Sequence, residues 1–143
     1  MKKPSTDFPL PEIWHPHRVS YGETDAMGVV YYANYLHWFE IARSAYIRQQ
    51  GISYNDIEEK GIFFPVTGAR CRYHRPARFD QLVYIRAAIS GWGKASFTFD
   101  YEVTSEDQEV VLATGRTDHA CVNKTGRPVR VPAWLKEMCS EKS

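Results

Sequence analysis

Long apolar runs are missing from this sequence of 143 residues. No stretch approaches the roughly 18 consecutive apolar residues that a membrane-spanning helix requires, so we expect no membrane span. The first residues, Met1–Asp7, carry two lysines, but no apolar segment follows them. That pattern argues against a secretory signal peptide.

An excess of charge of one sign is also missing. The 18 Lys and Arg residues nearly balance the 17 Asp and Glu residues, which leaves a formal net charge of +1. A protein that coats nucleic acid is expected to be strongly basic. The balance therefore excludes nucleic acid as the expected partner.

Cysteine is scarce, and the three that are present, Cys71, Cys121 and Cys139, form no CxxC pair. This excludes a disulfide scaffold and a zinc ribbon, and it predicts reduced thiols and a cytoplasmic location. His15 and His17 share a face if their segment is extended, but a zinc site needs a third ligand at a defined spacing. We expect no metal and no cofactor.

Length and composition predict one globular domain over residues 1–143. Apolar residues make up 43% and charged residues 24% of the chain, as is typical of a globular protein with one core. No repeat or linker divides the sequence. Residues 1–12, with three prolines, predict an irregular arm, and residues 139–143 a short polar tail.

One long helix is predicted from Asn34 to Gln50, with Asn34 as the N-cap and Gly51 just past the C-terminal end. Apolar residues recur at helical spacing, and Leu36 and Ile41 extend the apolar surface beyond a single stripe. A helix that is apolar on most sides is buried on most sides. We expect a curved sheet to wrap around it.

Period-two alternation predicts strands on both sides of this helix. The first covers Trp14–Gly22, with Val19 and Tyr21 on one face. A meander of four follows: Phe64–Tyr73, Leu82–Ser90, Ser96–Thr104 and Val110–Asn123. Weaker signals predict a short helix at 53–59, an edge strand at 127–131 and a helical turn at 133–138. The order predicts an α+β domain with five or six mostly antiparallel strands, whose open edges favour dimerisation.

Two acidic residues, Glu23 and Asp25, lie in a loop between glycines just before the long helix. The simplest interpretation is a polar turn. The alternative uses the free N–H groups at the helix start, which can polarise a carbonyl while a nearby carboxylate attacks it or activates water. That arrangement predicts acyl transfer at Asp25, with Glu23 as a solvated or structural residue.

The residues around this loop resemble a known family. The pattern comprises Arg18-Val19, Thr24-Asp25, Gly28-Val29-Val30, Tyr31-Tyr32 and Asn34-Tyr35, followed by Trp38, Glu40, Ala42 and Arg43, then Pro76–Asp80 and Trp92–Phe97. It is similar to the 4-hydroxybenzoyl-CoA thioesterase family and to the acyl-CoA thioesterases of the Tol-Pal cluster type. The resemblance covers about residues 16–132.

The resemblance implies a hotdog fold, in which an antiparallel sheet wraps a long helix. It also implies a homodimer or homotetramer with active sites at subunit interfaces, and an acyl-CoA substrate. Asp25 matches the catalytic carboxylate, as nucleophile or as base for water. The backbone N–H of Tyr32 matches the group that polarises the thioester carbonyl, although many relatives carry His at this position.

Coenzyme A carries phosphate groups and needs cationic partners. Lys94 lies in a segment that resembles a phosphate-contacting turn of the family. Arg75, Arg78 and Lys124 are further candidates for substrate binding, although basic side chains also simply solvate a sheet.

Two other functions remain open at this stage. A hotdog domain could bind acyl-CoA without hydrolysing it, although the carboxylate of Asp25 argues against pure binding. A hotdog dehydratase would need a histidine acting on the acyl chain, and the Asp25 loop contains none. A serine hydrolase of the GxSxG type is excluded, because the motif is absent.

Overall fold

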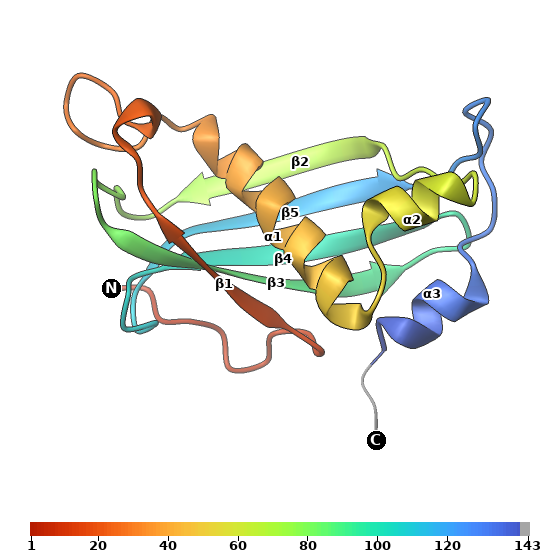
Figure 1. Cartoon of the computed structure of the whole chain (residues 1–143). Coiled ribbons are helices and arrows are strands. Elements are labelled where there is room, and N and C mark those ends of the chain that lie inside the picture. The colour runs from red at the N-terminus through yellow and green to blue at the C-terminus, as the bar shows by residue number, and fades with distance from the viewer. Residues whose placement is uncertain (141–143) are drawn as a thin grey trace.

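The computed structural model describes residues 1–140, and its core is one antiparallel sheet with a long helix across one face (Figure 1). The elements in chain order are β1 (Ile13–Arg18), the 3₁₀ helix η1 (Tyr21–Glu23), α1 (Asn34–Gln50), α2 (Tyr54–Glu59), β2 (Val66–Tyr73), β3 (Leu82–Trp92), β4 (Ser96–Thr104), β5 (Val111–Ala120) and α3 (Ala133–Met138). This confirms the predicted α+β class with five strands.

The strand order across the sheet is β1-β3-β4-β5-β2. Only β3, β4 and β5 form a meander, so the prediction of a four-stranded one is wrong: β2 pairs with β5 at the far edge of the sheet. The physical reason lies in the connections. Tight turns at 93–95 and 105–110 join the meander strands, whereas the eight residues 74–81 are long enough to carry the chain from one side of the sheet to the other.

Helix α1 has the predicted bounds, and Gly51 ends it with a φ of 112°, a left-handed conformation that glycine adopts without strain. The predicted N-cap is wrong. Ala33 holds that position in a helical conformation, because a turn from Tyr31 already leads into the helix. The Asn34 amide instead donates to the carbonyl oxygen of Glu23 at 2.8 Å.

The helix packs on the sheet through Phe39 and Gly115. The Phe39 ring is fully buried and stacks on Tyr101 with a centroid separation of 4.3 Å and an interplanar angle of 11°. A Cβ atom on Gly115 would overlap the Phe39 ring, so the missing side chain sets how closely the helix approaches. The sheet covers one side only: Leu36 is 43% exposed, so the prediction of a helix buried on most sides fails there.

Three local predictions also differ from the structure. Strand β1 ends at Arg18 because Ser20 and Glu23 close a capping box around η1, and Tyr21 is therefore exposed instead of sharing the buried face of Val19. The segment 127–131 forms only an isolated bridge at Pro128, which lacks an N–H for a regular ladder. Cys139 is buried and belongs to the core, not to a polar tail; residues 141–143 of that tail lie outside the described residues.

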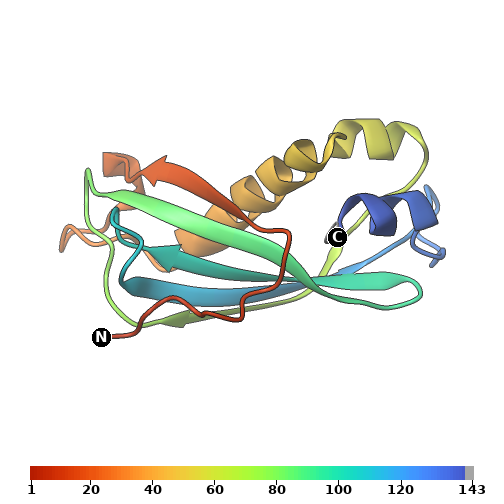
Figure 2. The same ribbon diagram turned by 90° about the horizontal axis from the view of Figure 1, so that it is seen from below.

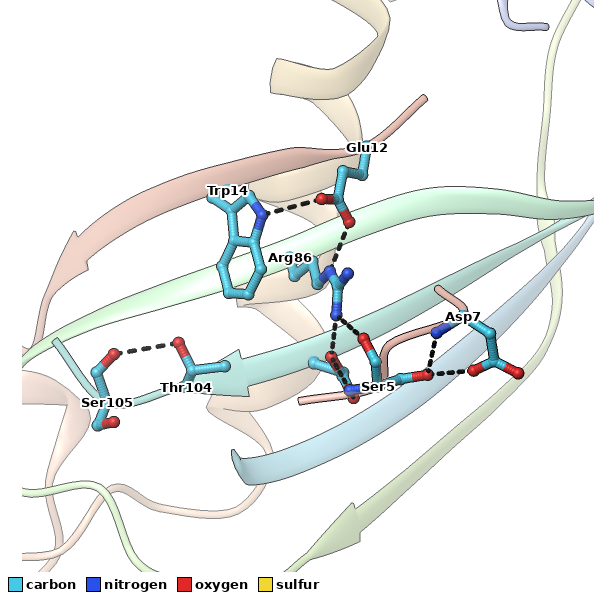
Figure 3. A network of polar contacts seen from close by, with 8 residues as sticks. Ser5, Asp7, Glu12, Trp14, Arg86, Thr104 and Ser105 are labelled. Carbon is cyan, nitrogen blue, oxygen red and sulfur yellow. Dashed lines mark hydrogen bonds and ion pairs between the residues drawn. The ribbon is translucent and has the colours of Figure 1, made fainter. Parts of the chain in front are cut away.

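The N-terminal arm, residues 1–12, is irregular as predicted, and it crosses the sheet face opposite α1 (Figure 2). The Arg86 guanidinium holds the arm there, because it pairs with Glu12 and donates to the carbonyl oxygen of Ser5 (Figure 3). It also pairs with Glu102 of β4. The two carboxylates thereby share one buried cation, and such pairing and hydrogen bonding are what allow charged groups to be buried.

Replacing Gly115 with alanine tests the close approach of the helix. The added methyl group must displace the Phe39 ring, and such overpacking costs about 1–3 kcal/mol. Urea unfolding of Gly115→Ala measures the loss. Gly91→Ala is the control, because its Cβ meets no atom within 4 Å; equal stability of the two variants would contradict this account of the packing.

Lowering the pH should destabilise the protein through His119. This side chain is buried, and burial, with Arg43 nearby, lowers its pKa from 6.5 to about 4. The unfolded chain binds the proton first as pH falls, so stability is lost from pH 6.5 downward, by about 3 kcal/mol at pH 4. Urea unfolding measures the free energy of unfolding at pH 7 and pH 4. The difference between the two values should be smaller in His119→Gln than in the wild type, by about 3 kcal/mol. The exposed His37→Gln should keep the wild-type dependence, and the same dependence in all three proteins would contradict the prediction.

Candidate active site

The loop before α1 folds back on itself. The N–H of Asp25 donates to the carbonyl oxygen of Val29 at 2.9 Å, and Thr24 bridges to Val30. Gly28 makes the reversal at a φ of 78°, a conformation that glycine adopts without steric cost. The result is a tight loop that presents Asp25 next to the entry of the helix.

One oxygen of the Asp25 carboxylate is held by its own loop. Oδ1 accepts hydrogen bonds from the N–H of Met27 at 2.8 Å and of Val29 at 3.4 Å. Within residues 1–140, Oδ2 has no hydrogen-bond partner, and the side chain is exposed. The carboxylate is therefore oriented and has one oxygen free to attack a substrate or to take a proton from water.

The loop is fastened to the connection between β2 and β3. Val30 N–H donates to the carbonyl oxygen of Ala77 at 2.8 Å, and Val29 bridges to Arg78. Because Ala77 is fully buried, this attachment is part of the core. It also brings the predicted binding residues Arg75 and Arg78 to the same end of the sheet as Asp25.

Two backbone donors are free at the start of the helix. The N–H of Tyr31 donates to Glu23 and the N–H of Asn34 donates to Tyr31. Between them, the N–H groups of Tyr32 and Ala33 have no acceptor in the described part of the chain. Adjacent free N–H groups at the positive end of a helix dipole are suited to bind a developing oxyanion.

A shallow apolar depression of about 320 Å³ lies beside these donors. Its walls are Val30, Tyr32, Tyr35, Tyr73, His74, Arg75 and Pro76. The Tyr73 hydroxyl donates to the carbonyl oxygen of Tyr32 at 3.0 Å. This bond fixes the peptide between Tyr32 and Ala33. The depression has the size of a small-molecule pocket and could hold a small apolar group beside Tyr32.

A larger depression of about 1000 Å³ lies on the opposite face of the sheet, between the N-terminal arm and β2. Three arginines, Arg70, Arg72 and Arg116, line it together with acidic residues. It is separated from Asp25 and from the free N–H groups by the sheet itself. The smaller depression is therefore the candidate site for the reaction.

Glu23 is structural, but it is not solvated, and the sequence did not reveal its importance. Its side chain is only 15% exposed and contacts His17 Nε2 at 2.9 Å and Trp38 Nε1 at 2.6 Å. It also accepts from the N–H of Ser20 at 2.8 Å. Burial raises the pKa of Glu23, but the hydrogen bonds from Trp38, Ser20 and His17 outweigh burial and hold that pKa below its ordinary value.

The remaining predicted residues lie elsewhere. Lys94 is in the turn between β3 and β4, where its carbonyl oxygen accepts from Val131, and Lys124 is in the turn that Asn123 closes. Figure 1 shows both turns at the end of the sheet away from the loop before α1. One chain therefore brings Asp25, Tyr32, Arg75 and Arg78 to one end and Lys94 and Lys124 to the other.

Neither a metal site nor a membrane span is found in the described residues. Residues 1–140 contain no group of three or more His, Cys, Asp or Glu side chains placed to hold a metal ion. Within the same range, no helix is long and apolar enough to cross a membrane. The three cysteines are unpaired with one another.

Comparison with known proteins adds independent information. The family model of the thioesterase-like superfamily matches residues 19–138. An acyl-CoA thioesterase of Haemophilus influenzae is 33% identical over 123 residues, covering 85% of this chain and 89% of that protein.

Solved structures agree with this match. A protein of Aquifex aeolicus superimposes with a TM-score of 0.84 at 30% identity, over 90% of this chain and 99% of the other. A DHNA-CoA thioesterase of Staphylococcus aureus gives a TM-score of 0.81 at 31% identity, over 88% and 85% of the two chains. The architecture of these proteins is the hotdog fold, as predicted.

Proposed function

This chain belongs to the thioesterase-like superfamily, and we propose that it hydrolyses acyl-CoA thioesters to a carboxylic acid and CoA, with Asp25 as the catalytic carboxylate. One observation carries the proposal. The loop before α1 holds the Asp25 carboxylate by one oxygen, and just before α1 the N–H groups of Tyr32 and Ala33 have no acceptor among the described residues.

The chemistry follows from these groups. The Asp25 carboxylate attacks the thioester carbonyl carbon directly, or it takes a proton from a water molecule that attacks instead. In either route the carbonyl oxygen becomes an oxyanion, which the N–H of Tyr32 stabilises. Collapse of the tetrahedral intermediate expels CoA thiolate, a good leaving group, and the direct route then needs water to hydrolyse the acyl-aspartyl anhydride.

The acyl group would occupy the depression beside Tyr32. The ring of Tyr73 makes edge-to-face contacts with the rings of Tyr32 and Tyr35, at centroid separations of 6.3 Å and 5.1 Å. Flat aromatic walls of this kind favour a flat aromatic acyl group over a long flexible chain. The S. aureus relative is named for such a substrate, a DHNA-CoA.

The active assembly we propose is a homodimer, or a homotetramer built from it, with sites at subunit interfaces. Strand β2 is an open edge of the sheet, and exposed apolar side chains lie on this strand, in the loop before α1 and in the first turn of α1. These are Met27, Tyr31, Tyr32, Leu36, Val66 and Tyr73. Antiparallel pairing of two β2 edges would cover this surface and bring the partner's opposite end toward Asp25.

The partner would then add its Lys94 and Lys124 to the two arginines of this end. Arg75 and Arg78 lie near the depression, whereas Lys94 and Lys124 reach an acyl-CoA only from a second subunit. The free cysteines fit the reducing cytoplasm, which we propose as the location.

Replacing Asp25 with asparagine should abolish most turnover without unfolding the protein. Asparagine keeps an oxygen for the N–H groups of Met27 and Val29 but is neither a nucleophile nor a base, so kcat should fall about a hundredfold to ten-thousandfold. Thiol release from a panel of aromatic and aliphatic acyl-CoAs measures kcat.

Asp107→Asn is the matched control, because Asp107 likewise closes its own turn, at the β4–β5 hairpin, through Ser105 and Glu109. Equal turnover by Asp25→Asn and wild type would show that the catalytic carboxylate is elsewhere. Tight binding of acyl-CoA with no thiol release by the wild type would favour the non-hydrolytic binding module instead.

Replacing Lys94 with alanine tests the nucleotide contact. Loss of one charge-assisted contact to phosphate should raise KM for acyl-CoA about threefold to tenfold and leave kcat unchanged. KM for the matching acyl-pantetheine, which lacks the nucleotide phosphates, should not change. Lys136→Ala on α3, also exposed, is the control, and an unaltered KM for acyl-CoA in Lys94→Ala would remove Lys94 from the binding site.

A further inference from the structure

Glu23 connects three elements that meet at the candidate site. Its side chain reaches back to His17 on β1 and across to Trp38 on α1, and it closes η1 at Ser20. His17 and Trp38 also pack on each other, with ring centroids 5.0 Å apart. The contacts hold the start of the loop between the first strand and the helix.

The backbone of the same residue holds the other side of the site. The carbonyl oxygen of Glu23 accepts from the N–H of Tyr31 at 2.9 Å and from the Asn34 amide at 2.8 Å. These two partners flank Tyr32 and Ala33, whose N–H groups meet no acceptor among residues 1–140. Glu23 is also two residues before Asp25, so one residue fixes both the carboxylate and the oxyanion donors.

Only a carboxylate satisfies all the donors around this side chain. Oε1 faces the N–H and hydroxyl of Ser20, while Oε2 faces the indole N–H of Trp38. A carboxylate accepts at both oxygens, whereas the amide of glutamine accepts at one end and donates at the other. Glutamine at position 23 must therefore set its NH₂ group against either Ser20 or Trp38.

We propose that Glu23 is a positioning residue that holds Asp25 and the Tyr32 N–H in register for thioester hydrolysis, an inference that rests on the proposed function. Transition-state stabilisation depends on the relative placement of nucleophile and oxyanion donors, and a displacement of about 1 Å can cost about a hundredfold in rate. Substrate binding in the neighbouring depression depends on that placement much less. Loss of the Glu23 contacts should therefore lower kcat and leave KM nearly unchanged.

The experiment is a double-mutant cycle on Glu23 and Trp38. Glu23→Gln should lower kcat about tenfold to a hundredfold. Trp38→Phe removes the indole donor, so the NH₂ group of glutamine can face that ring without opposing another donor. The combined variant Glu23→Gln/Trp38→Phe should therefore have a higher kcat than Glu23→Gln alone.

Leu135→Ala is the control for a general loss of stability. Leu135 is buried in α3, away from the loop, so its truncation should lower stability and leave kcat unchanged at a temperature where all variants are folded. A kcat loss in Leu135→Ala as large as in Glu23→Gln, or a combined variant no faster than Glu23→Gln, would overturn the positioning role.

Amide hydrogen exchange of peptides covering residues 20–33 provides a readout that needs no activity. Glu23→Gln should speed exchange in this segment, whereas Leu135→Ala should not. Unchanged exchange, or faster exchange with an unchanged kcat, would overturn the inference. Absence of thiol release by the wild type would overturn the proposed function and the catalytic part of this inference together, and exchange would still decide whether Glu23 holds the loop.

Discussion

The close contact between the Phe39 ring and Gly115 is the constraint on which the rest of this structure depends. It seats α1 on the sheet at a distance that only a residue without a side chain permits, and the stack of Phe39 on Tyr101 fixes the helix laterally. The position of every group in the candidate site depends on where the first turn of this helix lies. If the helix lay farther from the sheet, the N–H groups of Tyr32 and Ala33 would move away from the β2–β3 connection, which holds the loop at Ala77.

With the helix in this position, local hydrogen bonds shape the candidate site. The loop between β1 and α1 contains few large buried side chains, so hydrogen bonds, not apolar packing, determine its shape. Glu23 supplies those that reach β1 and α1, at His17 and Trp38, and Val30 supplies the one that reaches Ala77. Asp25 and Gly28 supply those within it. Burying the Glu23 carboxylate removes it from water, and the structure compensates because each of its two oxygens accepts hydrogen bonds.

The sequence predicted the elements better than their arrangement. The apolar spacing from Tyr35 to Tyr46 and the glycine at 51 predicted the body and the C-terminal end of α1, because both signals are local. The N-cap was predicted one residue too late, at Asn34 instead of Ala33. The position of β2 beside β5 was missed. The alternating pattern of a strand predicts that it belongs to a sheet, but it does not say which other strand it pairs with. The exposure of Leu36 was missed for a related reason: the spacing of apolar residues along a helix does not tell which of them the sheet covers. The resemblance to a known family predicted Asp25 and Tyr32 as site residues, and both stay predictions. The contacts of Glu23 reach residues up to 15 positions away, so no local pattern pointed to them.

Tyr32 shows why this kind of site tolerates variation. Its backbone N–H is the proposed oxyanion donor, while its side chain, 61% exposed, forms a wall of the depression that would hold the acyl group. The two roles are carried by different atoms of one residue. A change from histidine to tyrosine at this position therefore alters the shape and polarity of the pocket without removing the donor. The Tyr73 hydroxyl holds the carbonyl oxygen of Tyr32, which lies in the peptide that follows the donor, so the backbone on that side stays in place while the ring adapts to a different acyl group. Catalysis and substrate preference can then change separately within a loop of a dozen residues.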